Sequence, residues 1–468
     1  MKNFLLSIFV ISSFLANAQD FRFIKGSVTD SLPINLEKSA TFALFAPSNY
    51  TSEKEWPVLF VFDPLGRGKS SANLFRNVAE NQGYLIISSN INIKEKPLDS
   101  VVNMATTMFN TVFKSLPVNK QMVYSAGLSE GAQIASSLPI FYPDVSGVLA
   151  IGNSLLDRKS INKKKPFMFI AMGGKRDYMI YEMELYLKFF DDIDFPTDVY
   201  YYDGKEDEWP DPQILENAVS SFSLQAVKDG HRTKDENFVA ILYKSQVDYA
   251  ERLRRQLNYY DSYEVLERIE KRFEDFGYED QTEDMLKELK RSDGFKKQRN
   301  NFRQITSYER TQQDEYEYLL KNDIYNADFQ NIGWWAYQID EIDKIIDNSD
   351  ALKSNMASRL KGYLDFITKK NFDQIIASNA GIDYKIYISV LRTAINKSDP
   401  EAYLKIISLA GADGDDQTAL LYLEDLLKTG FSDIEALYNI PGALNLTFTK
   451  EYNALIKQYL GESKYFND

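Results

Sequence analysis

Short apolar segments alternate with amphipathic ones through the first half of the chain, from about residue 21 to residue 230. Residues 98–116 and 181–189 carry apolar positions at helical spacing. The other segments are continuously apolar, as expected of strands that are buried on both faces of a sheet. The pattern therefore predicts a mostly parallel sheet covered by helices on both faces. The predicted strands are Thr41–Phe45, Val58–Phe62, Leu85–Ile87, Met122–Tyr124, Val148–Ile151, Phe167–Ile170 and Val199–Tyr201.

From about residue 233 onward the strand-like segments disappear, and Glu, Lys, Asp, Tyr and Leu dominate. Residues 238–260 and 262–276 each carry a helical apolar stripe. Residues 402–430 resemble a tetratricopeptide-type helix pair, with Gly411 and Gly414 between the two helices. The repeat length is not uniform, so a helical solenoid and an irregular bundle both remain open. We expect an α/β domain over residues 20–231 and an all-α, tetratricopeptide-like domain over residues 232–468.

The N-terminus has the pattern of a secretory signal peptide over residues 1–18. Lys2 precedes an apolar run over residues 4–15, and the small residues of Ala16-Asn17-Ala18 follow it. No Cys follows the expected cleavage point, which excludes a lipid anchor on the mature N-terminus. No later segment approaches the roughly 18 consecutive apolar residues that favour a membrane span. We expect an exported protein, in the periplasm or outside the cell, that is not lipid-anchored.

The composition of the chain excludes several classes of partner and ligand. The chain has 468 residues, a formal net charge of −14, no Cys and one His. Its acidity argues against nucleic acid as a partner, and the absence of Cys excludes disulfides and thiolate ligands. Neither acidic loop, residues 205–208 or 413–416, has the ligand spacing of a calcium loop. The Gly-Lys-Ser of residues 68–70 lacks the first Gly of a phosphate-binding loop. We therefore expect neither a metal nor a cofactor.

The candidate for chemistry is Gly127-Leu128-Ser129-Glu130-Gly131, which lies between a predicted strand and a helical segment. A nucleophile elbow needs small residues two positions before and after the serine, because a Cβ there would clash in the sharp turn. The turn presents the serine hydroxyl to solvent. The position of the motif, inside a pattern of parallel strands, predicts an elbow at Ser129.

Residues 125–132 resemble the elbow of α/β-hydrolase-fold esterases of the dienelactone-hydrolase and feruloyl-esterase kind. Residues 169–177 resemble the strand and turn that deliver the triad acid, which implies that role for Asp177. The resemblance covers about residues 58–230 and implies an α/β-hydrolase fold with Ser129 as nucleophile. It also implies an oxyanion hole formed by the backbone N–H of Glu130 and of Leu65 or Gly66.

The chain departs from this family where the triad histidine is expected. In the family the histidine stands two residues before a tryptophan, and here Asp207 stands two residues before Trp209. The sole histidine, His231, lies beyond the predicted helix over residues 213–228. Two substitutes for the base are open: Asp207, with its pKa raised by neighbouring carboxylates, or His231, if the domain junction folds back over the sheet. Loss of a triad member typically costs on the order of 10⁴ to 10⁶ in rate.

These observations leave two functions open. The favoured one is a catalytically impaired, esterase-like protein that binds another protein through its helical half, for example in a complex at the outer membrane or cell surface. The competing one is a working serine esterase that attacks an acyl or carbohydrate ester with Ser129. Ser129 and Asp177 are catalytic residues in the working esterase. In the impaired protein they are vestiges of a catalytic site.

Overall fold

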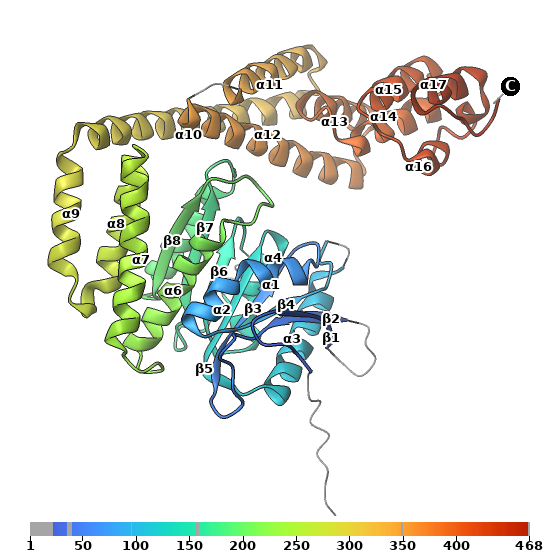
Figure 1. The fold of residues 1–468 in the computed structure, drawn as a ribbon. Coiled ribbons are helices and arrows are strands. Elements are labelled where there is room, and N and C mark those ends of the chain that lie inside the picture. Colours follow the sequence, from blue (N-terminus) through green and yellow to red (C-terminus); the bar gives the residue numbers. More distant parts are fainter. Residues whose placement is uncertain (1–21, 35–39, 95, 155–158, 348–349, 467–468) are drawn as a thin grey trace, which may run out of the picture. The chain divides into compact units, whose positions relative to one another are not determined.

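The computed structural model describes residues 22–34, 40–94, 96–154, 159–347 and 350–466 (Figure 1). The expected signal peptide lies outside these residues. The chain divides into two compact units. The first unit contains the residues up to Gly174 together with Ile180–Gln256 and Asp261–Leu286. The second contains Lys175–Met179, Leu257–Tyr260 and Lys287–Asp468.

The first unit is built on an eight-stranded sheet with the strand order β1-β2-β4-β3-β5-β6-β7-β8. Six strands run parallel to one another: β4, β3, β5, β6, β7 and β8. Strand β2 is antiparallel to both β1 and β4. This order is that of an α/β hydrolase, and it confirms the predicted fold class. The strands are β1 (Val28–Pro33), β2 (Thr41–Phe45), β3 (Trp56–Phe62), β4 (Leu85–Ser89), β5 (Val118–Leu128), β6 (Val145–Ile151), β7 (Met168–Gly174) and β8 (Thr197–Tyr202).

Two apolar cores lie on opposite faces of the sheet because successive side chains of a strand point to opposite sides. Val58, Phe60 and Phe62 of β3 belong to one core, which includes residues of α3, α4 and α5. Leu59 and Val61 belong to the other, with residues of α1, α2 and α6. The helices that cover the sheet are α1 (Gly68–Leu74), α2 (Arg76–Gln82), α3 (Leu98–Ser115), α4 (Glu130–Phe141), α5 (Ile180–Asp191) and α6 (Pro212–Lys228).

The first unit continues about 55 residues beyond the expected boundary at residue 231, because it includes α7 (Glu236–Arg255), α8 (Tyr259–Phe273) from Asp261 onward and the start of α9 (Glu279–Arg291). Gln246 of α7 donates a hydrogen bond to Ser220 of α6 at 2.8 Å. On α8, the Arg272 guanidinium lies 2.8 Å from the carboxylate of Asp198, which is buried on β8. Helical periodicity predicts these helices but not the core against which they pack.

The second unit is helical. Helices that follow one another in sequence pack together, as α12 does with α13, α13 with α14 and α14 with α15. Their lengths range from 5 to 34 residues, so they do not form a uniform repeat, and the tetratricopeptide-like assignment stays a prediction. The helices are α10 (Asp293–Asn326), α11 (Ile332–Ile346), α12 (Ala351–Ala377), α13 (Ile382–Ile395), α14 (Pro400–Asp413), α15 (Asp416–Lys428), α16 (Ile434–Tyr438) and α17 (Lys450–Leu460); short 3-10 turns are Glu274–Phe276 in the first unit and Phe329–Asn331 and Leu446–Phe448 in the second.

The expected helix pair near residues 402–430 corresponds to α14 and α15. Gly414 ends α14 in a left-handed conformation with φ 79°. Gly411, expected between the helices, lies inside α14, where a Cβ would press on Ala443. A glycine in a helix can serve close packing as well as a turn, and the sequence does not distinguish the two uses.

A buried ion pair anchors the second unit. The Glu309 carboxylate of α10 accepts a hydrogen bond from the Arg359 Nε of α12 at 2.8 Å. The same guanidinium donates to the backbone carbonyl of Lys175. The Tyr178 ring stacks on Phe366, with ring centroids 5.2 Å apart. These contacts explain why the short segment Lys175–Met179 belongs to the second unit. Within the described residues, no helix is long and apolar enough to cross a membrane.

We expect Asp198→Ala to destabilise the first unit, because it removes the carboxylate that faces the buried guanidinium groups of Arg268 and Arg272. Removing one partner of a buried pair typically costs about 3–5 kcal/mol in the free energy of unfolding. Urea unfolding of the full chain measures this loss. Asp192→Ala removes the same charge from an exposed position and should cost less than about 0.5 kcal/mol. Equal losses in the two variants would contradict the packing of α8 against β8.

Candidate functional site

Ser129 lies on a sharp turn between β5 and α4, as the sequence predicts. Its backbone has φ 52° and ψ −120°, a conformation that L-residues rarely adopt and that stores roughly 1–3 kcal/mol of strain. The turn is held by a hydrogen bond of 2.9 Å from the Ser129 N–H to the Ile151 carbonyl on β6. The elbow is therefore formed at the carboxyl end of the parallel strands.

Two glycines make this turn possible. A Cβ on Gly127 would lie under 3.0 Å from the backbone of Gly131. A Cβ on Gly131 would in turn lie under 3.0 Å from the Phe62 carbonyl of β3. No side chain fits at either position without moving the backbone. Helix α4 therefore starts directly against the end of β3.

The Ser129 hydroxyl has no hydrogen-bond partner in the described parts of the chain. The residue itself is partly exposed. Because Glu130 opens α4, its backbone N–H has no acceptor within the helix. The turn thus offers a hydroxyl and a backbone donor, but no base contacts the hydroxyl.

The loop after β3 is tied to one buried carboxylate, that of Asp63, whose side chain is 1% exposed. Asp63 Oδ1 accepts hydrogen bonds from the Leu65 N–H at 2.9 Å and from the Arg67 N–H at 3.2 Å. The Gly66 N–H donates to the Asp63 carbonyl at 3.0 Å. Both amides expected to complete an oxyanion hole thus already have acceptors. The oxyanion role of Leu65 stays a prediction, and this hydrogen bond argues against it.

Asp63 also joins this loop to the loop between β8 and α6. Its Oδ2 accepts from the Trp209 indole N–H at 2.8 Å and from the Arg67 guanidinium at 2.8 Å. Burial raises the pKa of the Asp63 carboxyl, but these hydrogen bonds outweigh burial and hold that pKa below its ordinary value. Asp63 is thus ionised at neutral pH and serves as an acceptor.

Asp207, at the position where the family has histidine, is engaged with a lysine. Its Oδ2 lies 2.7 Å from the Lys94 ammonium, which also lies 3.7 Å from the Glu130 carboxylate. The hydrogen bond to Asp207 raises the pKa of Lys94 above its ordinary value, so the ammonium stays charged. The Asp207 carboxylate is thus occupied by an ion pair with Lys94. Asp207 is therefore near the elbow but is placed as an ion-pair partner.

The sole histidine does not reach the elbow. His231 lines a cavity of about 600 Å³ together with Trp56, which starts β3, and Met122, which lies early in β5. Seven residues of extended β5 separate Met122 from Ser129, roughly 23 Å at 3.3 Å per residue. His231 thus lies at the amino ends of the strands and Ser129 at their carboxyl ends. The alternative in which the junction folds back to bring His231 over Ser129 is wrong.

Asp177 is buried three residues after the end of β7. Its Oδ1 accepts a hydrogen bond of 2.9 Å from the Met179 N–H, so it shapes the turn before α5. Asp177 belongs to the segment that packs with the second unit. Its pairing with Ser129 stays a prediction.

In the described residues, no three His, Cys, Asp or Glu side chains are grouped so that they could hold a metal ion. Sequence reasoning missed Asp63 and Lys94, which organise the loops around Ser129. Asp63 follows a fully buried strand directly, and a carboxylate at that position is a usable signal. Lys94 follows β4 within a polar loop, and nothing in its surroundings distinguishes it from other surface lysines.

Comparisons with known proteins give distant likenesses. No protein-family model matches the chain, and no curated protein matches it in sequence. A hyperthermophilic esterase from the archaeon Pyrobaculum calidifontis is 14% identical with a TM-score of 0.34, over 45% of this chain and 86% of the esterase. An arylesterase is 11% identical with a TM-score of 0.34, over 44% of this chain and 87% of its own. An S-formylglutathione hydrolase from Staphylococcus aureus is 13% identical with a TM-score of 0.31, over 39% and 89%. The fold assignment rests on the strand order and the elbow.

The elbow makes a sharp prediction for two helical glycines. Gly131→Ala should destabilise the first unit by about 3 kcal/mol or more, because its Cβ meets the backbone carbonyl of Phe62. Gly333→Ala, in α11, meets nothing within 4 Å and should stabilise by up to about 1 kcal/mol through helix propensity. Thermal unfolding of both variants beside wild type measures the contrast. A neutral Gly131→Ala would show that α4 does not approach β3 so closely.

Proposed function

We propose that this chain is an exported protein whose α/β-hydrolase-like domain does not hydrolyse esters at Ser129, and whose helical unit binds a protein partner. The observation that carries the first part is the position of His231 at the amino ends of the strands. A serine hydroxyl needs a base within hydrogen-bond reach to become a nucleophile. The only imidazole in the chain lines a pocket with Met122, which roughly 23 Å of strand separates from Ser129.

The carboxylates around the elbow support the same proposal. Asp63 accepts four or more hydrogen bonds within its own loop and from Trp209, and Asp207 accepts from Lys94. A carboxylate with a pKa below its ordinary value is a poor base for a hydroxyl. Asp63 therefore stabilises the loop and takes no proton from Ser129. Asp207 is engaged by the Lys94 ammonium at 2.7 Å and does not contact Ser129 in the described residues.

A working serine esterase is the second candidate, and the strained elbow favours it. Ser129 keeps positive φ and a hydroxyl without a partner in the described residues, and a folded elbow can be retained for catalysis. In this mechanism the Ser129 oxygen attacks an acyl carbonyl, with the oxyanion held by the Glu130 N–H. The hydroxyl proton needs an acceptor, and Asp207 would first have to leave Lys94.

Ester turnover by the purified chain separates the two candidates. We expect p-nitrophenyl acetate hydrolysis by wild type to equal that by Ser129→Ala, because the triad base is missing and its loss costs on the order of 10⁴ to 10⁶ in rate. Ser136→Ala, a buried serine on the following helix, controls for general effects of losing a hydroxyl nearby. Turnover by wild type about tenfold above Ser129→Ala, with Ser136→Ala active, would establish the esterase.

The partner proposal rests on exposed aromatic side chains of the helical unit. Tyr318 and Tyr325 lie seven residues apart on one face of α10 and are 66% and 78% exposed. The Tyr384 hydroxyl of α13 donates to the Tyr325 carbonyl, which places a third partly exposed ring beside them. Large aromatic side chains in the open are enriched where proteins bind one another. A surface of this kind in a soluble exported protein fits a protein partner, for example in a complex at the outer membrane or cell surface.

Trp334 and Trp335 of α11 differ in exposure. Trp335 is fully buried and donates to Asp323, whereas Trp334 is 38% exposed and neighbouring Tyr337 is 56% exposed. The two exposed rings lie on α11, outside the group formed by Tyr318, Tyr325 and Tyr384. They add aromatic area to the same unit without changing the partner proposal.

Site-specific photocrosslinking in the producing cells tests the partner. A photoreactive phenylalanine at Tyr325 should crosslink to one discrete protein, because a bound partner covers that ring. The same group at Leu185, exposed on α5 of the first unit, is the control and should give no such product. Equal products at the two positions, or none at Tyr325, would contradict a partner on this surface.

A further inference from the structure

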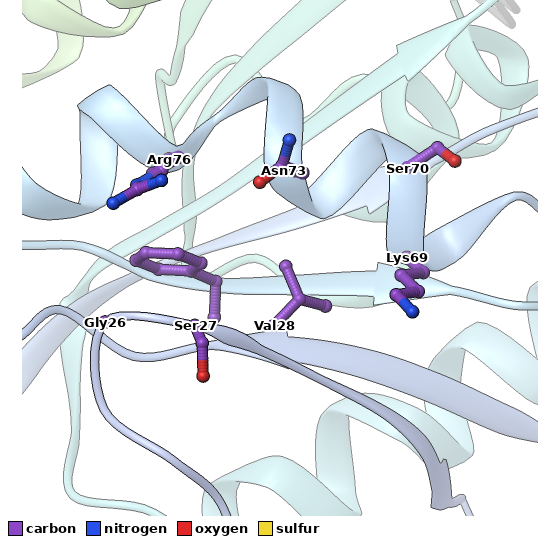
Figure 2. Close-up of a pocket in the computed structure, with 8 residues that line it drawn as sticks. Gly26, Ser27, Val28, Lys69, Ser70, Asn73 and Arg76 are labelled. Carbon is purple, nitrogen blue, oxygen red and sulfur yellow. The ribbon is translucent and has the colours of Figure 1, made fainter.

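A surface pocket lies between the start of β1 and the α1–α2 helical run, on the edge of the sheet formed by β1 and β2. It has a volume of about 440 Å³, within the range of pockets that hold small ligands. Figure 2 shows Gly26, Ser27 and Val28 along one side of the pocket and the helical side chains along the other. The elbow residues are not part of its lining. The pocket is therefore separate from the candidate hydrolase site, and the inference does not rest on the proposed function.

The helical side of the pocket presents polar groups that have no partner in the described residues. Lys69 and Asn73 lie four residues apart on one face of α1, and Arg76 opens α2. All three line the pocket. Ser70 adds a hydroxyl beside them. None of the four side chains forms an ion pair or a hydrogen bond within the parts of the chain that the structure describes. They leave an ammonium, a guanidinium, an amide and a hydroxyl available to a ligand.

The charge of this lining is unusual for the molecule. Its two charged residues are both cations, and no Asp or Glu lines the pocket, although the chain carries a formal net charge of −14. A guanidinium forms paired hydrogen bonds with planar or tetrahedral oxyanions, and an ammonium adds a point charge. The pocket is therefore suited to anionic oxygen groups.

An apolar floor completes the pocket. Val28 of β1 points toward the helices in Figure 2. The buried Phe45 of β2 also lines the pocket. A ligand that fills this space needs a small apolar or aromatic body as well as its charge, because apolar area removed from water contributes to binding. An inorganic ion would use the cations but not the floor.

We propose that this pocket binds a small organic anion, a carboxylate or phosphate carried on an apolar or aromatic body. The oxyanion accepts hydrogen bonds from Arg76 and Lys69. Asn73 and Ser70 supply neutral donors, and the apolar body packs on Val28. Because the site uses no covalent step, it is a binding site and not a second catalytic centre. Such a ligand would stabilise the folded first unit by a free energy that grows with the logarithm of its concentration once that exceeds the dissociation constant.

Calorimetric titration of the full chain with phenyl phosphate tests the proposal, with inorganic phosphate and phenol as reference probes. We expect saturable binding of phenyl phosphate, weaker binding of inorganic phosphate and none of phenol. Lys69→Ala/Arg76→Ala should weaken phenyl phosphate binding at least about tenfold, since two charge-assisted contacts are lost. Both positions are exposed, so thermal unfolding should show that this double variant is folded.

Lys114→Ala/Arg303→Ala is the matched control, because it removes the same two charges from exposed positions outside the pocket. Its affinity should stay within about twofold of wild type. Val28→Ser should weaken the binding of phenyl phosphate more than that of inorganic phosphate. This difference distinguishes the contribution of the apolar floor from that of the two cations. Equal losses in the two double variants would reduce the binding to general electrostatics and overturn the proposal. So would the absence of saturable phenyl phosphate binding below about 10 mM.

Discussion

The close approach of the β5–α4 turn to β3 is the constraint on which the first unit depends. Gly131 lies against the Phe62 carbonyl and Gly127 against the backbone of Gly131, with no space for a Cβ at either position. That approach sets the start of α4 and forces Ser129 into positive φ. The loops after β3, β4 and β8 lie at the same end of the sheet because these strands are parallel. The geometry of a hydrolase elbow is therefore a packing requirement here, whatever chemistry the serine performs.

Around the elbow, groups that could serve catalysis form structural contacts. Asp63 gathers the Leu65 and Arg67 amides, the Arg67 guanidinium and the Trp209 indole. Lys94 lies between the carboxylates of Asp207 and Glu130. Each contact fixes a loop, and each removes a donor or an acceptor from the reach of a substrate. Asp63 and Lys94 have pKa values shifted in the directions that keep both charged, which maintains these contacts at neutral pH. In the described residues, Ser129 is partly exposed and its hydroxyl has no hydrogen-bond partner.

The sheet was predictable because parallel strands buried on both faces are continuously apolar. All seven expected strands are present, and all but Thr41–Phe45 are longer than expected. The edge strand β1 was missed because its sequence, VTDSLP, mixes polar residues with a terminal proline. The elbow was predictable from the spacing of Gly127, Ser129 and Gly131. The Asp63–Trp209 hydrogen bond joins residues 146 positions apart, and no local sequence pattern predicts such a contact. The domain boundary was missed for a related reason, since the Arg272–Asp198 pair that holds α8 on the sheet is also a long-range contact.

Fluorophosphonate labelling of the folded chain, with the modified residue identified by mass spectrometry, tests the central claim most directly. A fluorophosphonate reacts with a serine only when a base activates the hydroxyl. The structure predicts no labelling of Ser129 between pH 6 and 9 beyond that of the unfolded chain, because no base contacts its hydroxyl in the described residues. Stoichiometric labelling of Ser129 in the folded chain, lost on unfolding, would contradict the account and establish an activated nucleophile.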